Sequence, residues 1–372
     1  MKVLYDATPL LMRSAGVKNY HYSLLLRLLP SIWPHQMELF PWLGSLPPNE
    51  NQRSNYPAWQ TYAGLGTMLA SNWLGLPLAR LQAQGADLFH VTQHLWRPPQ
   101  TARLTSMVHD PTPLTMPECH TESNVRYFER FVERTLPRLD ALITPSYAVK
   151  RDLVRYCGAA EERITVIPHG VDEDFFEATP AQREVARQTY ELPDRYMLFV
   201  GSVEPRKNLT GLLDALEMLP DSLRRQVPLL LVGPHGWKNE EIQKRLAKTD
   251  HVRTLGYVKR ELLPAVYEAC SLFVFPSLYE GFGMPLLEAM AAGAPVLSSN
   301  TSAMPEVVGD AGLLVGPQEP HRMAEAIRNA LEDQHTAALM GGQARQRARR
   351  FTWERCALET KKFFEETLEE AL

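Results

Sequence analysis

The sequence has few of the features that mark disulfide-rich, zinc-binding or membrane-spanning proteins. Its four cysteines, Cys119, Cys157, Cys270 and Cys356, lie far apart and form neither a Cys-x-x-Cys pair nor a zinc-type spacing with histidine. We therefore expect reduced, structural cysteines in a cytoplasmic protein. No run approaches the roughly 18 apolar residues of a membrane span. The first residues enter a strand without the long apolar core of a signal peptide.

The charges give no indication of a nucleic-acid partner, because the net charge is −4 and no basic stripe is present. Through Asp172 the chain has 16 basic and 14 acidic residues, against 23 and 29 afterwards. The slight excess of basic residues in the first half is typical of a solvated face, although an anionic acceptor or a membrane surface would also suit it. Peripheral association with the inner face of a membrane therefore stays open.

Short apolar runs alternate with helix-like segments along the whole chain, which predicts an α/β protein. At 372 residues the chain is long for one core. We expect a first domain over residues 1–172, a linker over 173–190, a second domain over 191–352 and a terminal helix over 353–372 that returns to the first domain. No strand is followed by Gly-x-Gly-x-x-Gly, which disfavours an NAD-dependent oxidoreductase.

The most informative stretch runs from residue 271 to 299 and reads as strand, loop, helix and strand. The apolar run Leu272–Phe275 precedes a loop with Gly283, and Pro285 fits the first helical turn. A glycine-bearing loop that enters a helix is suited to phosphate, since backbone N–H groups and the helix dipole both favour an anion. Glu280 and Glu288 flank this position. The alternative is an ordinary βαβ unit with two incidental glutamates.

Three further positions lie where ligands bind in open α/β sheets, at the carboxyl ends of strands. His109 and Asp110 end one strand, and His109 could donate to a sugar hydroxyl or bond a neighbouring carbonyl. Arg206 and Lys207 occupy a strand-to-helix turn, where they could neutralise a diphosphate or simply be solvated. Gly16 follows the first strand and could be a ligand-approach glycine or a plain turn.

Other features are weaker. Tyr257 could cover a base, or it could only pack in its loop. Asp172 and Asp174 form an Asp-x-Asp pair, but they lie in a charged segment without flanking strands, so we do not assign them a metal. Residues 44–80 are rich in Pro, Gly, Asn and Trp, which predicts long loops.

Taken together, the motifs resemble the family 4 glycosyltransferases of the GT-B fold, most closely the mannosyltransferase-like members of bacterial polysaccharide assembly. The resemblance covers nearly the whole chain, and the spacing of Glu280 and Glu288, with seven residues between them, is its most specific part. The segments that carry it are Asp6-Ala-Thr-Pro with Gly16 and Tyr20, Val108–Asp110, Val166–Asp172, Gly201–Asn208, Leu255–Val258, Phe275–Glu288 and Met304–Asp310.

The resemblance implies two Rossmann-like, doubly wound domains that face a cleft, with the acceptor mostly on the first and the nucleotide sugar mostly on the second. It implies a retaining reaction without a bound metal or another cofactor. Arg206 and Lys207 would hold the diphosphate, Glu280 would contact the donor sugar near its reacting carbon, Glu288 would accept from the ribose, and His109 would contact the sugar from the opposite domain.

The same resemblance places further residues near the donor. Gly16 would lie near the phosphates, and the base would meet the backbone around Tyr257 and Val258. Some relatives carry an arginine where Ser202 stands, which makes Arg206 more important here or leaves the site less cationic. The backbone amides that would complete the phosphate site are those of Phe282, Gly283 and Met284.

The sequence thus predicts a hexosyltransferase that moves a hexose, with mannose favoured, from a nucleoside-diphosphate sugar such as GDP-mannose. The acceptor would be a glycan or a lipid-linked glycan of polysaccharide or lipopolysaccharide assembly. Two alternatives stay open at this point: a nucleotide-sugar epimerase with the same fold, and a catalytically silent subunit that only binds the nucleotide sugar.

Overall fold

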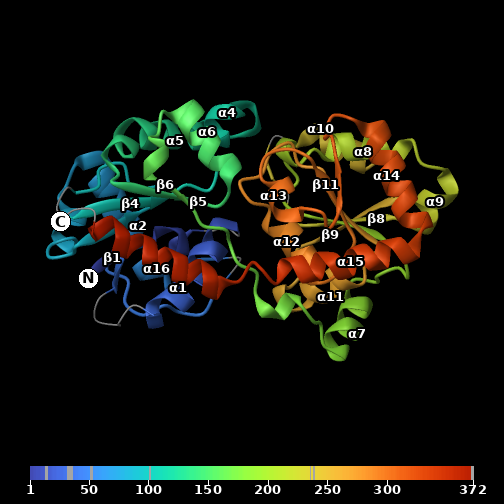
Figure 1. Cartoon of the computed structure of the whole chain (residues 1–372), viewed down its shortest axis with the longest axis horizontal. Helices are drawn as coiled ribbons and strands as arrows, with labels where there is room; N and C mark the ends of the chain where they lie inside the picture. Colours follow the sequence, from blue (N-terminus) through green and yellow to red (C-terminus); the bar gives the residue numbers. More distant parts are fainter. Residues whose placement is uncertain are drawn as a thin grey trace. The chain divides into compact units, whose positions relative to one another are not determined.

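The computed structural model describes residues 1–12, 16–31, 37–50, 53–99, 102–234, 236–237 and 239–369. The chain forms two compact units (Figure 1). The first contains the residues up to Gly170 together with the C-terminal helix that begins at Trp353. The second runs from Val171 to Thr352. In the described part of the chain, no helix is both long enough and apolar enough to cross a bilayer.

The first unit is built on a six-stranded parallel sheet with the order β2-β1-β3-β4-β5-β6. Its strands are short and buried, as expected for a parallel sheet covered on both faces. Figure 1 shows α5 and α6 on one side of this sheet, with α1 and α16 on the other. The strands are β1 (Val3–Asp6), β2 (Met37–Phe40), β3 (Leu88–Val91), β4 (Arg103–Met107), β5 (Ala141–Thr144) and β6 (Ile164–Val166).

Two helices of the first unit begin at side-chain caps. The side chain of Thr121 accepts from Asn124 N at the start of α5, and that of Ser146 accepts from Val149 N at the start of α6. The C-terminal helix α16 packs along α1. The helices are α1 (Gly16–Ser31), α2 (Ala58–Leu69), α3 (Leu78–Gln82), α4 (Thr112–Thr115), α5 (Glu122–Arg134), α6 (Tyr147–Cys157) and α16 (Trp353–Glu369), with short turns η1 (Thr8–Leu11), η3 (Ala70–Leu74), η4 (Pro117–Cys119), η5 (Leu136–Arg138) and η6 (Glu161–Arg163).

The expectation of long loops over residues 44–80 is wrong for its second half. Helix α2 and the π-helical turn η3 occupy Ala58–Leu74. Pro57 and Pro77 stand just before α2 and α3, where proline is compatible with a helix start. The glycines in α2 favour a loop in the sequence-based prediction. In the structure, Gly64 faces Leu11: an added Cβ would come within 2.7 Å of the Leu11 Cδ1 atom, so the missing side chain allows the helix to pack closely there.

The second unit has its own six-stranded parallel sheet, in the order β12-β11-β10-β7-β8-β9. Numbered within the unit, this is the 3-2-1-4-5-6 order of a doubly wound Rossmann fold. The two parallel sheets confirm the predicted fold class. The strands are β7 (Met197–Val200), β8 (Leu229–Val232), β9 (Val252–Gly256), β10 (Leu272–Phe275), β11 (Val296–Ser299) and β12 (Leu313–Val315).

Residues 173–190, expected to be a linker, belong to the second unit. The Thr179 side chain and Gln182 form a capping box at the start of α7, which packs on α11. The helices and turns of the unit are η7 (Glu173–Phe175), α7 (Pro180–Thr189), η8 (Pro205–Lys207), α8 (Leu209–Glu217), α9 (Asp221–Gln226), α10 (Glu240–Leu246), η9 (Arg260–Leu262), α11 (Leu263–Glu268), α12 (Met284–Ala291), α13 (Met304–Val308), α14 (Pro320–Glu332) and α15 (Gln334–Ala348).

Candidate active site

The strand order of the second unit reverses between β7 and β10, which pair directly with each other. In open α/β sheets such a switch point leaves a crevice at the carboxyl ends of the two strands. The loop after β7 and the loop after β10 are joined there by a bond from Leu278 N to the Arg206 carbonyl oxygen. Asn208 adds a bond from its Nδ2 to the Pro276 carbonyl oxygen. The two loops are therefore joined at one rim, which we call the switch-point rim.

Glu280 is the centre of this rim. Its Oε1 lies 2.7 Å from Lys207 Nζ, and its Oε2 lies 3.0 Å from Arg206 Nη1. The side chains of Glu280 and Lys207 are only 9% and 8% exposed, so the pair is largely shielded from water. The Ser302 hydroxyl accepts from the Glu280 backbone N–H and fixes the loop. The sequence-predicted carboxylate and both predicted cations are thus in direct contact.

Arg206 links the Glu280–Lys207 pair to a second carboxylate, that of Glu204. Its Nη2 lies 2.8 Å from Glu204 Oε1, and its Nη1 also donates to the Tyr279 carbonyl oxygen. Glu204 is 1% exposed and accepts from the Ser202 hydroxyl. Two cations and two carboxylates therefore form a balanced cluster, which we call the charge cluster: Glu204, Arg206, Lys207 and Glu280.

Glu280 is ionised in this setting. Burial by itself raises the pKa of a carboxyl group, but the charges of Arg206 and Lys207 outweigh burial and bring the pKa of Glu280 from 4.5 down to about 2. A carboxylate with so low a pKa is a poor proton donor near neutral pH. Glu280 is therefore suited to accept hydrogen bonds and to face a positive charge, but not to act as a general acid.

Helix α12 begins directly beside the charge cluster. Gly283, at its N-cap, has φ of 93°, a left-handed conformation that disfavours other residues. Phe282 is buried and Pro285 lies in the first turn. The N–H groups in the first turn of a helix lack intrahelical acceptors and carry the positive end of the helix dipole. Phe282, Gly283 and Met284 thus stand where an anion can meet backbone donors and two cations.

Glu288 lies one turn further along α12 in a different environment. Burial raises its pKa from 4.5 to about 7, against the opposing effects of the Arg260 charge and a hydrogen bond from the Tyr267 hydroxyl at 3.0 Å. Arg260 in turn forms an ion pair with Asp172. Glu280 in the loop and Glu288 in the helix that follows it thus have pKa values on opposite sides of the ordinary value of a glutamate carboxyl group. Such divergent pKa values are typical of functional sites.

The predicted residues of the first unit lie at the carboxyl end of its sheet. His109 follows β4, and its ring packs edge-on against Tyr20, with centroids 4.8 Å apart. Its Nε2 is buried and has no hydrogen-bond partner among the described residues. Burial lowers the pKa of His109 to about 4, with Asp110 opposing and His94 adding to this effect. His109 is therefore a neutral donor or acceptor with an unused ring nitrogen.

Comparison with known proteins places these features in a family. Residues 39–175 match the family model described as Glycosyltransferase Family 4, and residues 182–347 match the model described as Glycosyl transferases group 1. The O-antigen chain mannosyltransferase B of Escherichia coli is 31% identical over 97% of this chain and 98% of its own length. The chain belongs to glycosyltransferase family 4. It is accordingly a hexosyltransferase.

The fold of this family 4 glycosyltransferase has close structural neighbours. Sucrose-phosphate synthase from Thermosynechococcus elongatus superposes with a TM-score of 0.76 and 21% identity over the full length of both chains. Anabaena HepE, solved in complex with UDP, gives a TM-score of 0.71 and 20% identity over 98% of this chain and 100% of its own. These likenesses confirm the predicted GT-B fold.

The remaining predicted donor residues of the glycosyltransferase lie at the ends of elements in both units. Gly16 is the exposed first residue of α1, and an added Cβ would meet nothing within 4 Å. Tyr257 follows β9 and is 47% exposed, whereas Val258 is buried. Gly16 and His109 belong to the first unit, while the other predicted site residues belong to the second.

Sequence reasoning missed two contributors. It gave no role to Glu204, although the spacing Glu204-Pro-Arg206 puts both side chains in one turn, where they form an ion pair. It also gave Asp172 no functional role, whereas in the structure Asp172 forms an ion pair with Arg260, whose charge acts on Glu288. Among the described residues, no group of three or more His, Cys, Asp or Glu side chains is placed to hold a metal ion.

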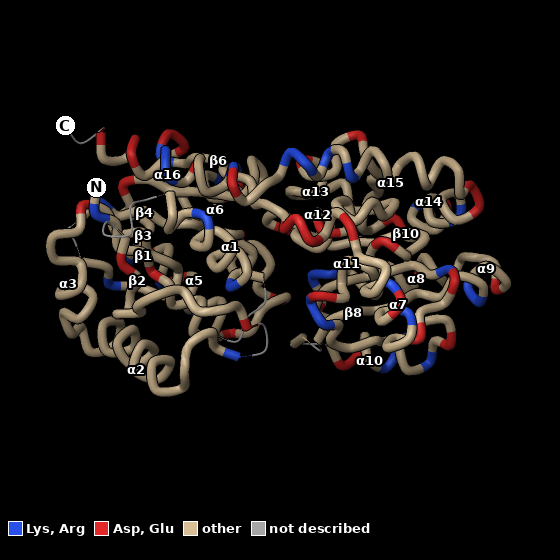
Figure 2. Tube along the Cα trace, turned by 90° about the horizontal axis from the view of Figure 1, so that it is seen from below, with Lys and Arg blue, Asp and Glu red and all other residues tan. Residues whose placement is uncertain are grey.

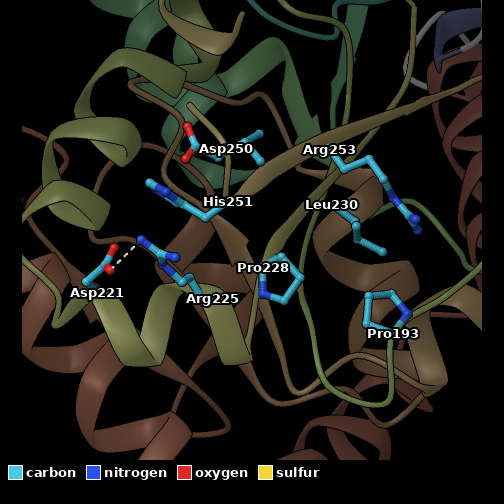
Figure 3. Close-up of a pocket in the computed structure, with 9 residues that line it drawn as sticks. Pro193, Asp221, Arg225, Pro228, Leu230, Asp250, His251 and Arg253 are labelled. Carbon is cyan, nitrogen blue, oxygen red and sulfur yellow. Dashed lines mark ion pairs between the residues drawn. The ribbon is translucent and has the colours of Figure 1, made fainter. Parts of the chain in front are cut away.

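A pocket of about 400 Å³ lies elsewhere in the second unit (Figure 3). Pro228, Val252 and Arg253 line it at the beginnings of β8 and β9, and Arg225 and Asp221 form an ion pair at its side. In a parallel sheet the beginnings of the strands lie at the edge opposite to their carboxyl ends, where ligands normally bind. This pocket is therefore separate from the charge cluster.

Proposed function

We propose that this glycosyltransferase transfers mannose from GDP-mannose to a glycan or lipid-linked glycan acceptor, with retention of anomeric configuration and without a metal ion. The observation that carries the proposal is the charge cluster beside the start of α12. It combines the buried Lys207 and the partly buried Arg206 with helix-end amides at the switch point of the second unit. These groups can balance the negative charge that grows on a departing nucleoside diphosphate.

Each part of the site has a role in this reaction. Arg206 and Lys207 bind the diphosphate, and the N–H groups at the start of α12 complete its coordination. Glu280, held as a carboxylate, faces the donor sugar and the positive charge that develops at its reacting carbon. Glu288 accepts from ribose hydroxyls when ionised. His109 offers its unused ring nitrogen to the sugar.

The choice of mannose rests on the similarity to the O-antigen chain mannosyltransferase B of Escherichia coli, and GDP-mannose is the corresponding activated mannose. By the same similarity we assign the acceptor to a growing bacterial surface polysaccharide. A cytoplasmic enzyme would meet such an acceptor at the inner face of the membrane.

The proposal is tested with purified protein, a panel of nucleotide sugars and mannose-terminated acceptors, in the presence of EDTA. We expect transfer from GDP-mannose, with proton NMR of the product showing an α-linkage. Loss of activity in EDTA that returns with Mg²⁺ would refute metal independence, and a β-linked product would refute retention. Conversion of the donor without any acceptor, or donor binding without transfer, would refute the transfer reaction itself.

A further inference from the structure

The outward face of α2 is apolar, which is the reverse of the usual pattern for a surface helix. Trp59, Tyr62 and Leu69 lie on this face at helical spacing and are 70%, 75% and 42% exposed. Ala63 and Gly66 between them are also exposed. The face therefore presents two aromatic rings and an isobutyl group to the surroundings without one charged side chain.

The orientation of α2 is fixed by its other face. Gly64 and Met68 are buried, and the helix packs on η1, where an added Cβ at Gly64 would come within 2.7 Å of the Leu11 Cδ1 atom. Turning the helix to hide Trp59 and Tyr62 would remove this close contact. The outward apolar residues are therefore a feature of the folded unit.

The apolar surface continues beyond the helix. Trp73, Leu74 and Leu76 are 55%, 73% and 46% exposed, and Leu81 on α3 is 52% exposed. Together with the outward face of α2 they form what we call the α2 surface: Trp59, Tyr62, Leu69, Trp73, Leu74, Leu76 and Leu81. Exposed apolar side chains that gather in one segment, rather than occurring singly, mark an interaction site.

The chain segment that carries the α2 surface has charged residues of one sign only. No acidic residue occurs from residue 51 to residue 86, and no charged residue of either sign lies between Arg53 and Arg80. The tube of α2 in Figure 2 is accordingly free of red and blue. Arg80 is exposed on α3, and the Arg97 guanidinium lies beside Gly75, next to Leu74 and Leu76. The Arg130 guanidinium lies 4.5 Å from the Trp73 ring centroid.

We propose that the α2 surface docks onto the anionic surface of a lipid bilayer. Tryptophan and tyrosine are favoured at the headgroup level of membranes, and leucine side chains gain free energy by entering the acyl region. Arginine at the edge of the patch attracts anionic lipid headgroups, and the segment from residue 51 to residue 86 adds no carboxylate that would repel them. A glycan-binding platform would also use aromatic rings, but it would need carboxylates or amides for the sugar hydroxyls, and the exposed leucines would not serve it.

The proposed function explains only why docking would be useful, namely to bring the enzyme to a lipid-linked acceptor. The surface itself is argued from the first unit alone. Its test therefore measures membrane binding without donor or acceptor, and transfer to a soluble acceptor is measured separately. Vesicle binding without any transfer would refute the proposed function and support the docking surface.

The experiment is co-sedimentation of the full chain with vesicles of phosphatidylcholine alone or with added phosphatidylglycerol. We expect wild type to bind the mixed vesicles with a blue shift in tryptophan fluorescence. The triple variant Trp59→Gln, Tyr62→Gln, Leu69→Gln should bind about tenfold or more weakly, because three apolar side chains no longer enter the interface. The variant Arg80→Glu, Arg97→Glu should lose its preference for phosphatidylglycerol.

The matched control replaces three similarly exposed apolar residues away from the α2 surface, Tyr156→Gln, Met218→Gln and Leu339→Gln. It should bind vesicles as wild type does. Circular dichroism and unchanged transfer to a soluble acceptor show that each variant is folded. Absence of vesicle binding by wild type, or an equal loss in the control, would overturn the proposal. So would a concentration-dependent dimer that the α2 variant abolishes, because a second copy would then be the occupant.

Discussion

Lys207 Nζ lies 2.7 Å from Glu280 Oε1 although 73 residues separate them in the chain. The contact exists because β7 and β10 are neighbours in the sheet, so that the loops at their carboxyl ends meet. Each charge in this buried pair compensates the other, and Arg206 links the pair to Glu204. A diphosphate that enters this cluster meets cations whose positions are already fixed, which reduces the reorganisation needed during reaction.

Lys207→Ala and Glu280→Gln should each lower kcat for sugar transfer by roughly 10²–10³, the usual cost of losing one preorganised electrostatic contact. Initial rates at saturating donor measure this effect. Lys244→Ala on α10, an exposed lysine of the same unit, is the control and should behave as wild type. Variants that unfold below the assay temperature would be uninformative about kcat, so thermal unfolding is recorded in parallel.

Glu280→Gln should also destabilise the second unit by roughly 3 kcal/mol, because breaking a buried ion pair leaves its partners uncompensated. The loss should depend on pH. Since the pKa of Glu280 is lowered from 4.5 to about 2, its contribution is complete above pH 4.5 and disappears as the pH falls towards 2. Urea titrations across this range should show wild type approaching the variant. A constant difference in unfolding free energy would contradict the assigned pairing.

Arg206→Lys should lower kcat/KM by about tenfold or more although the charge is kept. The guanidinium group reaches Glu204, Glu280 and the Tyr279 carbonyl at once, and one ammonium group cannot reproduce that fork. The control is Arg245→Lys, whose ion pairs lie between α10 and α8. Equal kinetics for the two lysine variants would mean that the geometry of Arg206 is unimportant.

Donor affinity should rise with pH through about 7, because burial raises the pKa of Glu288 to that value and only the ionised carboxylate accepts from both ribose hydroxyls. The diphosphate of a nucleotide sugar has no titrating proton in this range. Isothermal titration with GDP-mannose between pH 6 and 8, a range set around a pKa of about 7, measures the step. Glu288→Gln should bind more weakly and show no step; a step that persists in this variant belongs to another group.

Gly283→Ala should weaken donor binding and destabilise the second unit by about 1–2 kcal/mol, because its φ of 93° strains any residue with a Cβ. The matched substitution is Gly342→Ala, at an exposed position of α15 where an added Cβ meets nothing within 4 Å. It should stabilise the protein by up to about 1 kcal/mol. Chemical unfolding of both variants gives the comparison, and equal effects would argue against a role for backbone geometry at Gly283.

The sequence predicts the local structure around Glu280 well, because several local signals agree. The apolar run Leu272–Phe275, the glycine at 283 and the proline at 285 each favour the strand, loop and helix that the structure contains. The turn at Arg206 and Lys207 is predicted in the same way, from an apolar strand before it and a helix after it. Reasoning from spacing is reliable here because each of these signals lies within one supersecondary unit.

Two kinds of feature could not be predicted from local patterns. The charge cluster depends on which strands are neighbours, and no periodicity in the sequence tells that the loop with Glu204 meets the loop with Glu280. Helix α2 was missed because its glycines and flanking prolines favour loops. The close approach of Gly64 to Leu11 is a tertiary contact, and local sequence patterns do not show such contacts. Its exposed aromatic residues likewise become a surface only once the inner face is known.

The most direct test of the central claim is the rate of mannose transfer from GDP-mannose in EDTA, measured for wild type and Lys207→Ala at saturating donor and acceptor. If the charge cluster and the start of α12 stabilise the leaving diphosphate, wild type remains fully active in EDTA and the variant loses roughly 10²–10³ in kcat. Near-wild-type transfer by folded Lys207→Ala would contradict the account.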